Sequence, residues 1–323
     1  MSLTYRNPVY SGYFADPFVF RHDGIYYAIG TGPIENESFV FPMLRSVDFV
    51  DWNQIGPAMP RLDANMGTDY WAPELAFDAG VFYLYYSVGI GDRGHHLRVA
   101  KSSSPTGPYS DIGPLMERGE APFTIDASPF KDDDGRWYLY YAVDFIDTAE
   151  GRPGTALVVD RLEEMTRLAG MPRTVLRARY DWQRYQAERS MYGAVWDWHT
   201  LEGPCIRKKN GLYYCLYSGG NWQNETYGVD FGVADHPLGP FMDAGAEAPR
   251  VLRTVPGRVL GPGHNSVIEG PDGRDYIVYH AWDVAGTARR MCIDPLEWTE
   301  EGPQCLGPTW TPQTIGSPSP HTA

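Results

Sequence analysis

The chain has 323 residues and a formal net charge of −14, from 27 Lys and Arg against 41 Asp and Glu. Nucleic acids and anionic membrane surfaces are bound through clustered Lys and Arg, so this excess of acidic residues argues against both partners. Hydrophobic residues make up 43% of the chain, but no uninterrupted apolar run approaches the roughly 20 residues that a membrane-spanning helix requires.

The composition favours strands and turns. The chain contains 10 Trp, 22 Tyr and 13 Phe beside 35 Gly and 27 Pro, which excludes a coiled coil or a helical solenoid and favours many short strands. The four cysteines, Cys205, Cys215, Cys292 and Cys305, fit neither a disulfide framework nor a CxxC metal site. Because the first residues also show no secretory signal, we expect a cytoplasmic location.

Five segments share one pattern, in which a turn glycine precedes an aromatic strand. In chain order they are DGIYYAIG with Gly24, AGVFYLYYS with Gly80, DGRWYLYYA with Gly135, NGLYYCLYS with Gly211 and DGRDYIVYH with Gly273. Asp-Gly and Asn-Gly supply the positive φ angles of hairpin turns, and the residues that follow alternate with the period of a strand. The intervals of 56, 55, 76 and 62 residues leave room for about four strands in each repeat.

Four-stranded antiparallel sheets that repeat around an axis form a β-propeller. The sequence therefore predicts an all-β fold, a five-bladed β-propeller with four-stranded antiparallel blades. We expect residues 1–310 to form this single domain, followed by a loosely held, Pro- and Ser-rich tail at 311–323. Residues 160–168 and 181–189 are expected to form a turn or two of helix each in the longest loop.

Three local motifs are interpreted as structural. Residues 89–94 match GxGxxG, but the following HHLRVAKSS predicts a strand instead of the helix of a dinucleotide site. The adjacent His95 and His96 lack the spacing of a metalloprotease pair, and we expect them at an exposed or rim position. Residues 132–135 lack the alternating ligands of an EF-hand and predict the third hairpin turn.

One register of the inner strands collects ionisable side chains. Counting back nine residues from the turn glycines reaches Trp71, Asp126, Glu202 and His264, and counting back eight in the shorter first hairpin reaches Asp16. The inner strands of a propeller converge on its axis, so these side chains are expected in one ring at a mouth of the channel. Three carboxylates in such a ring cost free energy unless a ligand, a cation or a raised pKa relieves them, which makes the ring a candidate site.

At these residues the chain resembles glycoside hydrolase family 43, five-bladed propeller enzymes that act on plant polysaccharides containing arabinose and xylose. The resemblance runs through NPVYSGYFADPFVF, YWAPELAF, TIDASPFKDDDGRWYLYYA, LEGPCIRKKNGLYYCLYSGG, GPGHNSVIEGPDGRDYIVYHAW and RRMCIDPLEW. It implies a general base at Asp16, an orienting and pKa-tuning carboxylate at Asp126 and a general acid at Glu202. The sequence departs from the family at Ala127, where the ID motif usually continues with Pro.

The resemblance implies further site residues. In the family the histidine of the GH motif, here His264, lies near the channel axis, often beside a bound Ca²⁺ or a water cluster, and Arg289 resembles an arginine that reaches into the substrate pocket. A structural Ca²⁺ that contacts His264 through water is therefore one expectation, whereas the chemistry requires no cofactor. Trp71 and Trp222 are candidates to stack on sugar, and packing within the blades is the other interpretation of Trp222.

Glycosidic cleavage requires a protonated carboxyl for the leaving oxygen and an ionised carboxylate on the other side of the sugar ring. Glu202 and Asp16 fit these roles, and a separation of roughly 6.5 to 9.5 Å would leave room for a water and predict inversion. An ionised Asp126 near Glu202 would keep Glu202 protonated near neutral pH.

We therefore predict an inverting glycosidase that releases α-L-arabinofuranosyl or β-D-xylosyl units from small or oligomeric saccharides derived from arabinan, arabinoxylan or xylan. An endo-acting arabinanase and a catalytically silent propeller that binds glycans or protein are the alternatives. Asp16, Asp126 and Glu202 argue against the silent propeller, because binding alone needs no protonated acid opposite a base. A related fructan hydrolase or mannoside phosphorylase would carry different motifs in its first blade and at the acid.

Overall fold

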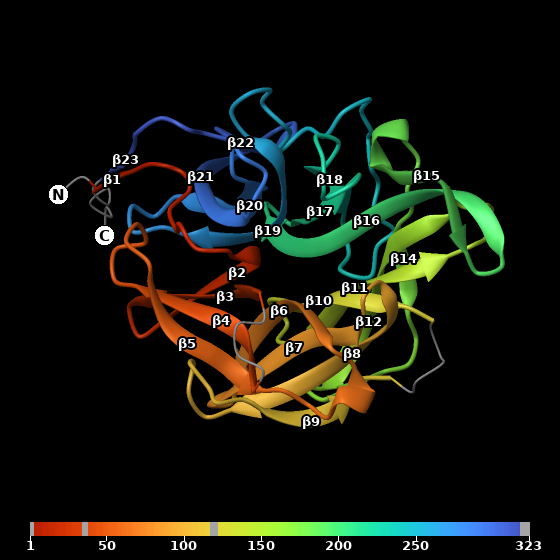
Figure 1. Ribbon diagram of the computed structural model, residues 1–323, viewed down its shortest axis with the longest axis horizontal. Coiled ribbons are helices and arrows are strands. Elements are labelled where there is room, and N and C mark those ends of the chain that lie inside the picture. The colour runs from red at the N-terminus through yellow and green to blue at the C-terminus, as the bar shows by residue number, and fades with distance from the viewer. Residues whose placement is uncertain (1–2, 34–37, 117–121, 317–323) are drawn as a thin grey trace.

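The computed structural model describes residues 3–33, 38–116 and 122–316, and strands dominate it (Figure 1). Five groups of antiparallel strands follow one another around a common axis, each built on one of the five predicted hairpins. The predicted all-β, five-bladed propeller is confirmed.

Blades 1, 2 and 5 are separate four-stranded sheets, each with its strands in chain order from the axis outward. Blade 1 consists of β2 (Ala15–His22), β3 (Ile25–Thr31), β4 (Phe39–Ser46) and β5 (Asn53–Pro60). Blade 2 consists of β6 (Asp69–Asp78), β7 (Val81–Ile90), β8 (Arg93–Ser102) and β9 (Ser110–Pro114). Blade 5 consists of β19 (Leu260–Glu269), β20 (Asp275–Trp282), β21 (Arg289–Thr299) and β22 (Gly302–Cys305).

Blades 3 and 4 keep the same antiparallel order but are joined into one nine-stranded sheet. The joint is a short parallel pairing of β12 with β16, at Gly154 with His199 and at Thr155 with Thr200. The strands of this sheet are β10 (Thr124–Lys131), β11 (Trp137–Phe145), β12 (Gly154–Glu164), β13 (Arg167–Leu168), β14 (Arg173–Leu176), β15 (Arg184–Met191), β16 (Ala194–Lys209), β17 (Leu212–Gly219) and β18 (Gly228–Ala234).

The aromatic second strand of each hairpin fills the spaces between blades. Successive side chains of a strand point to opposite faces of the sheet, so adjacent tyrosines pack against different neighbours. In β7, Tyr86 packs into the cluster shared with blade 1, which contains Ile29, and Tyr85 into the cluster shared with blade 3, which contains Leu139. Five such clusters, one at each junction of blades, form the core.

The two predicted helical turns are largely wrong. Residues 160–168 complete β12 and form β13, because the buried Leu162 lies between the exposed Arg161 and Glu163 in the alternation of a strand. Residues 181–189 contain a single 3₁₀ turn, Asp181–Gln183, and then continue as β15. A second 3₁₀ turn, Ala64–Met66, precedes blade 2.

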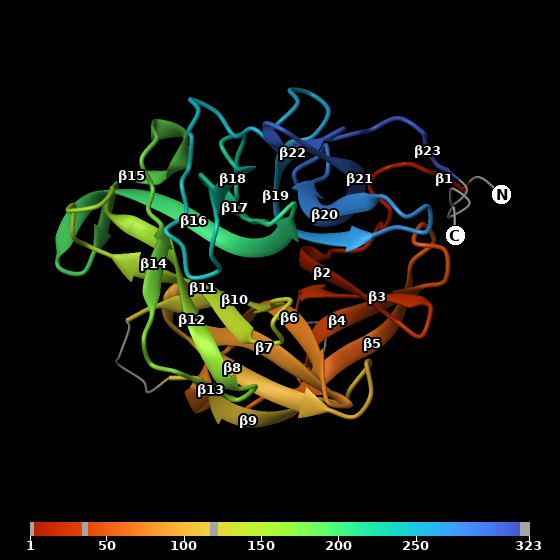
Figure 2. The same ribbon diagram turned by 180° about the vertical axis from the view of Figure 1, so that it is seen from behind.

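The end of the chain closes the ring. β1 (Leu3–Tyr5) pairs antiparallel with β23 (Gln313–Ile315), and the two strands lie side by side at one edge of the propeller (Figure 2). Ile315 is fully buried in the cluster between blades 5 and 1. The interpretation of a loosely held tail is therefore wrong for Gln313–Ile315; residues 317–323 lie outside the described part, and the division at residue 310 stays a prediction.

Other interpretations of local sequence are confirmed. The residues after the GxGxxG match form strand β8, and residues 132–135 form the third hairpin turn, in which the Gly135 N–H donates to the Asp132 carbonyl. All four cysteines are free. Within the described ranges, no helix is long and apolar enough to cross a membrane.

We expect Ile315→Ala to lower the free energy of unfolding by roughly 2–5 kcal/mol, because it leaves a cavity where the last strand closes the propeller. Thr314→Ala, in the same strand but exposed, is the matched control. Thermal and urea unfolding followed by circular dichroism would measure both, and equal stability of the two variants would contradict a structural role for β23.

Candidate active site

Each inner strand contains a β-bulge at the same place. The pairing register shifts between Ala15 and Phe18 in β2, and equivalent shifts occur in β6, β10, β16 and β19. The first bulged residue always has a positive φ, which is 51° at Asp16, 45° at Ala72, 59° at Asp126, 56° at Gly203 and 49° at His264. Left-handed backbone costs a non-glycine residue roughly 1–3 kcal/mol, and such strain collects at functional sites.

The bulges correct the predicted register. In blades 2 and 4 the bulge holds Ala72 and Gly203, so Trp71 and Glu202 lie one residue earlier than predicted. Two-residue hairpin turns in these blades, as in blade 1, place the bulge eight residues before the turn glycine. The five-residue turns of blades 3 and 5 place it nine residues before, so counting nine in every later blade was wrong for two of them.

A bulge leaves a backbone N–H without a partner in its own sheet, and the preceding blade supplies the acceptor. Four bulged residues are held in this way: the N–H of Ala72 donates to Thr31 Oγ1 at 2.8 Å, that of Gly203 to Asp126 Oδ2 at 2.9 Å, that of His264 to Ser218 Oγ at 2.7 Å and that of Asp16 to His280 Nδ1 at 3.1 Å. Contacts between blades therefore fix the backbone at the site.

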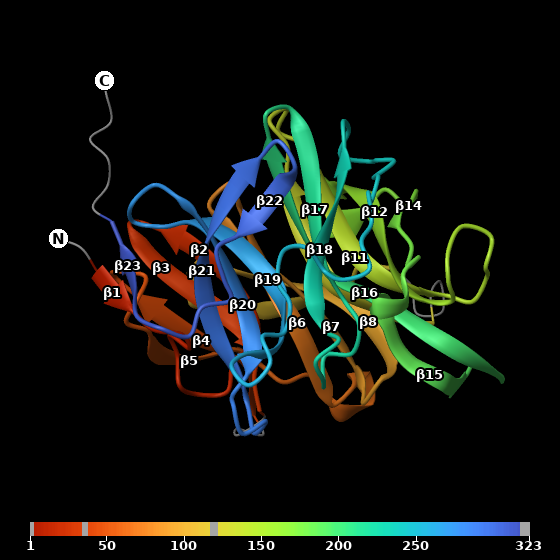
Figure 3. The same cartoon turned by 90° about the horizontal axis from the view of Figure 1, so that it is seen from above.

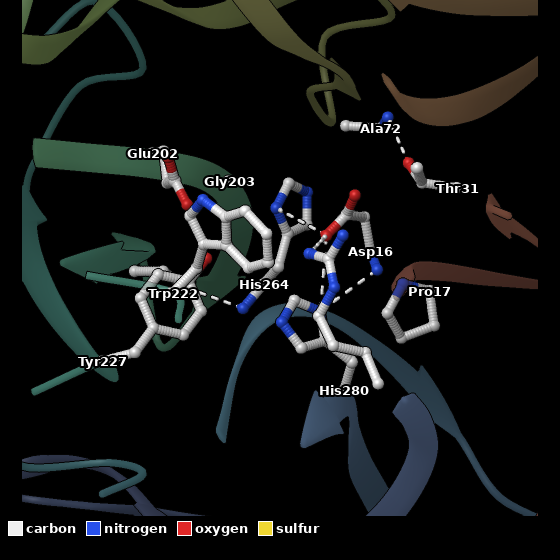
Figure 4. Close-up of polar contacts among 12 residues, drawn as sticks. Asp16, Pro17, Thr31, Ala72, Glu202, Gly203, Trp222, Tyr227, His264 and His280 are labelled. Carbon is white, nitrogen blue, oxygen red and sulfur yellow. Dashed lines mark hydrogen bonds and ion pairs between the residues drawn. The ribbon is translucent and has the colours of Figure 1, made fainter. Parts of the chain in front are cut away.

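Asp16 is buried among three basic side chains. Its Oδ1 lies 3.3 Å from His280 Nδ1 and 3.5 Å from His264 Nδ1 (Figure 4). The same oxygen lies 3.3 Å from Arg289 Nη1. Burial by itself raises the pKa of Asp16, but these partners outweigh it and hold the pKa below its usual range. Since burial also lowers the pKa of both histidines, Arg289 is the cation that keeps Asp16 ionised at neutral pH.

Glu202 has the opposite electrostatic environment. Its Oε1 accepts a hydrogen bond of 2.6 Å from Tyr227 Oη. Burial raises the pKa of Glu202 to about 7; the Tyr227 hydrogen bond opposes this shift, and the negative charge of Asp16 adds to it. Asp16 and Glu202 thus differ in protonation near neutral pH, because Asp16 is ionised and Glu202 is partly protonated.

Asp126 is coupled to Glu202 by charge and by the backbone. Burial, followed by the negative charges of Glu202 and Asp16, raises the pKa of Asp126 well above its usual range. The expectation of an ionised Asp126 that keeps Glu202 protonated is therefore wrong; burial and the charge of Asp16 raise the pKa of Glu202. Asp126 Oδ2 also accepts the N–H of Gly203, the residue after Glu202. In blades 1 and 4, Thr31 and Ser218 accept the N–H of the bulged residue in the next blade. The equivalent residue of blade 3 is Ala142, which has no hydroxyl, and the carboxylate of Asp126 accepts that N–H instead.

Arg289 and Trp222 form one side of the site. Arg289 Nε and Nη2 donate to Tyr13 Oη at 3.1 and 2.9 Å, and the guanidinium carbon lies 4.4 Å from the centre of the Trp222 ring. Trp222 also stacks on Trp282 with ring centres 6.0 Å apart. Trp222 therefore packs within the fold and borders the site at the same time.

Trp71 makes a different set of contacts. Its ring stacks on the imidazole of His95 with centres 3.6 Å apart. Both His95 and His96 are buried, so the expectation of an exposed or rim position is wrong; strand β8 turns them into the propeller. The structure thus gathers Asp16, Asp126, Glu202, His264, Arg289 and Trp222 around one centre and places Trp71 beside Ala72, against His95.

His280 and Tyr227 contact the carboxylates but were missed in the sequence. His280 lies in the strand DYIVYHAW at the register of Thr31 and Ser218, and a charged or polar residue at that register is the signal that could have found it. Tyr227 lies in the loop before β18, where no periodic pattern indicates which way a side chain points.

The donor set does not fit a directly coordinated Ca²⁺. Ca²⁺ takes six to eight oxygen ligands. Here the side chain between the two carboxylates is an imidazole, whose Nδ1 lies 3.5 Å from Asp16 Oδ1 and 4.0 Å from Asp126 Oδ2. In the part of the chain that the structure describes, no three His, Cys, Asp or Glu side chains are arranged to hold a metal ion. A Ca²⁺ that reaches His264 through water stays a prediction.

Comparison with known proteins agrees on one family. The model of the family "Glycosyl hydrolases family 43" matches residues 5–303. The chain is 32% identical over 317 residues to the Beta-D-galactofuranosidase xynD of Aspergillus niger, covering 92% of this chain and 83% of that protein. It is 28% identical over 295 residues to the extracellular exo-alpha-(1->5)-L-arabinofuranosidase of Streptomyces chartreusis, covering 86% and 82%. A solved thermostable family-43 glycoside hydrolase is 31% identical, with a TM-score of 0.81 over 98% of this chain and 99% of that one.

We expect Tyr227→Phe to raise the pKa of Glu202, because the lost hydrogen bond favours the ionised form. A hydrogen bond of about 1 kcal/mol corresponds to a shift of about 0.7 pH units. The basic limb of the pH dependence of kcat/KM for a 4-nitrophenyl glycoside should therefore move upward by about that amount. Tyr217→Phe removes a buried hydroxyl bonded to Asp243 and should leave that limb in place; equal shifts in both variants would contradict the assignment.

Proposed function

Because the chain belongs to glycosyl hydrolases family 43, we propose that it hydrolyses terminal α-L-arabinofuranosyl bonds with inversion, using Asp16 as general base and Glu202 as general acid. That it is a glycoside hydrolase follows from the family, whose model covers residues 5–303. The proposed reaction needs no metal, since a carboxyl pair supplies both proton transfers.

The observation that carries this proposal is the opposite protonation of two carboxyl groups in one buried site. Arg289 holds Asp16 ionised, and burial raises the pKa of Glu202 to about 7. Environments that push two such pKa values apart assign the acid and the base. A propeller that only bound glycans would gain nothing from this arrangement, whereas a glycosidase requires it.

The reaction follows from these states. Glu202 donates its proton to the leaving glycosidic oxygen while Asp16 accepts a proton from the attacking water on the opposite side of the ring. The bond from the anomeric carbon to the leaving oxygen breaks as the bond to the water oxygen forms. Afterwards Glu202 is ionised and Asp16 protonated, and exchange with solvent restores both.

Asp126 and His264 act as positioning residues in this scheme. Asp126 accepts the Gly203 N–H next to Glu202, and the charge of Glu202 helps to raise the pKa of Asp126. The His264 ring packs against Gly203, where a Cβ atom would approach it to 3.2 Å. The absence of a side chain at Gly203 thus lets His264 lie against the strand that carries Glu202.

The choice of sugar rests on the two relatives. β-D-Galactofuranose and α-L-arabinofuranose share their ring configuration and differ by one hydroxymethyl group, so enzymes named for either one bind the same furanose shape. A β-D-xyloside is the second candidate, in line with the resemblance. The arabinofuranosidase relative is named as extracellular, so the relatives do not support the cytoplasmic location expected from the cysteines.

Glu202→Gln and Asp16→Asn should each lower kcat about 10²- to 10⁴-fold, because each removes one proton-transfer group while keeping the shape of the side chain. Circular dichroism should show both variants folded. Asp134→Asn, at the exposed turn before β11, is a control that should retain the parent rate. A rate near that of the parent in either site variant would remove that residue from the mechanism.

The function itself is tested with 4-nitrophenyl α-L-arabinofuranoside, β-D-galactofuranoside and β-D-xyloside. We expect the highest kcat/KM for the arabinofuranoside, and proton NMR during the first minutes should show the product with the anomeric configuration opposite to that of the substrate. Retention would contradict the water-activating role of Asp16, and no hydrolysis of any substrate would favour a silent binding propeller.

A further inference from the structure

An arm extends the fourth blade at the end of the propeller that carries the site. It comprises residues 184–199, in which β15 pairs antiparallel with the first part of β16, and it projects from the side of the fold (Figure 3). Its base is held by the parallel pairing of β12 with β16 at His199 and Thr200. Glu202 follows two residues later, so the arm leads directly into the strand that carries the proposed acid.

A cavity of about 630 Å³ lies between the arm and blades 2 and 3. From the arm, Arg189, Tyr192 and Val195 line it; Asp92 of the β7–β8 turn and Phe123 before β10 complete the wall. We call this cavity the arm pocket. It is large enough for more than one sugar ring, and it combines apolar faces with a few polar groups, as saccharide and other small-molecule sites do.

The polar groups of the arm pocket are fixed in place. Arg189 Nη2 lies 2.6 Å from Asp92 Oδ2, and its guanidinium packs over the rings of Tyr185, at 4.9 Å, and Trp198, at 5.6 Å. Tyr192 Oη donates to Asp144 Oδ2 at 2.7 Å, which leaves the face of its ring partly exposed. Arg93, 4.0 Å from Asp92, also lines the pocket. Asp92 and Asp144 place two carboxyl groups beside these two arginines, so the pocket suits a neutral saccharide better than an acidic one.

Two sets of contacts lead from the arm pocket toward the inner strands that carry Glu202 and Trp71. On one side, the ring of Tyr185 lies beneath the Arg189 guanidinium, and the Tyr185 backbone carbonyl accepts a hydrogen bond of 3.0 Å from Asn221 Nδ2. The negative charge of Glu202 also contributes to a raised pKa of the Tyr185 hydroxyl, after burial. On the other side, the His95 ring lies between Trp71, at 3.6 Å, and Phe123, at 5.6 Å. Tyr185 therefore links the arm pocket with Glu202.

The position relative to the acid determines what the pocket receives. In the proposed reaction Glu202 protonates the leaving oxygen, so the saccharide attached to that oxygen departs on the Glu202 side. Resting on that proposed function, we propose that the arm pocket binds the leaving-group part of a neutral oligosaccharide substrate and that Arg189 is a specificity-determining residue. Trp71, through His95 and Phe123, supports the pocket wall instead of stacking on the terminal sugar.

The test compares α-(1→5)-linked arabinotriose, whose leaving group is a disaccharide, with 4-nitrophenyl α-L-arabinofuranoside, whose leaving group does not fill the pocket. The quantity measured is the kcat/KM for arabinotriose divided by the kcat/KM for the 4-nitrophenyl arabinofuranoside. A lost hydrogen bond to a charged group changes an equilibrium about 10- to 100-fold, so we expect Arg189→Ala to lower the ratio by that factor, mainly through KM for arabinotriose.

A second pocket variant tests the proposal in case Arg189→Ala does not fold. Val195 is 63% exposed, so Val195→Arg should fold normally and fill the pocket, lowering the ratio in the same direction. Arg167→Ala, which removes an exposed arginine paired with Glu163 and Glu164 at the far edge of blade 3, is the matched control and should keep the parent ratio.

The outcomes separate this proposal from the one on which it rests. A ratio within twofold of the parent in both pocket variants, with arabinotriose hydrolysed by the parent, overturns the arm pocket and leaves the proposed function intact. Hydrolysis of neither substrate by the parent overturns the proposed function and the pocket with it. A ratio that falls in both pocket variants but not in the control supports the pocket.

Discussion

The site depends on one repeated interaction, the hydrogen bond from the N–H of a bulged inner-strand residue to a side chain of the blade before it. The bulge turns the carboxylates of Asp16 and Asp126 toward the axis, and the borrowed acceptor satisfies an N–H that would otherwise be buried without a partner. For Asp16 that acceptor is His280 of the last blade. The proposed base is therefore in place only when the fifth blade has closed against the first, with β1 and β23 completing the closure.

The same contacts explain how three carboxyl groups share a buried centre. Arg289, from the last blade, lies next to Asp16 and stabilises its charge, while Glu202 and Asp126 remain far enough from compensating cations that burial raises their pKa values. Because Arg289 lies closer to Asp16 than to the other two carboxyl groups, chemically similar residues differ in protonation. If Arg289 stood midway between them, the difference on which acid and base catalysis depends would be lost.

The repeated part of this architecture could be predicted from the sequence, and the irregular part could not. Turn glycines before aromatic strands, four of them in Asp-Gly or Asn-Gly pairs, revealed all five hairpins, and with them Asp16, Asp126 and His264. Trp71 was misplaced because turn glycines stand at different distances from the bulge in two-residue and five-residue turns. Contacts across blades, such as that of Tyr227 with Glu202, join residues whose pairing depends on loop geometry and leaves no local pattern.

The longest interval between repeats is the one in which the sequence interpretation failed most. Between Gly135 and Gly211 the chain adds β13, β14, β15 and the first part of β16 to the basic blade, and charged residues there conceal strands as apparent helical turns. The ring of bulges fixes the catalytic carboxyl groups and leaves little room for variation, since each depends on its neighbour. Segments inserted between blades carry no such constraint. In this chain the arm, residues 184–199, leads directly into the strand segment that carries Glu202, the group whose proton determines which substituent leaves.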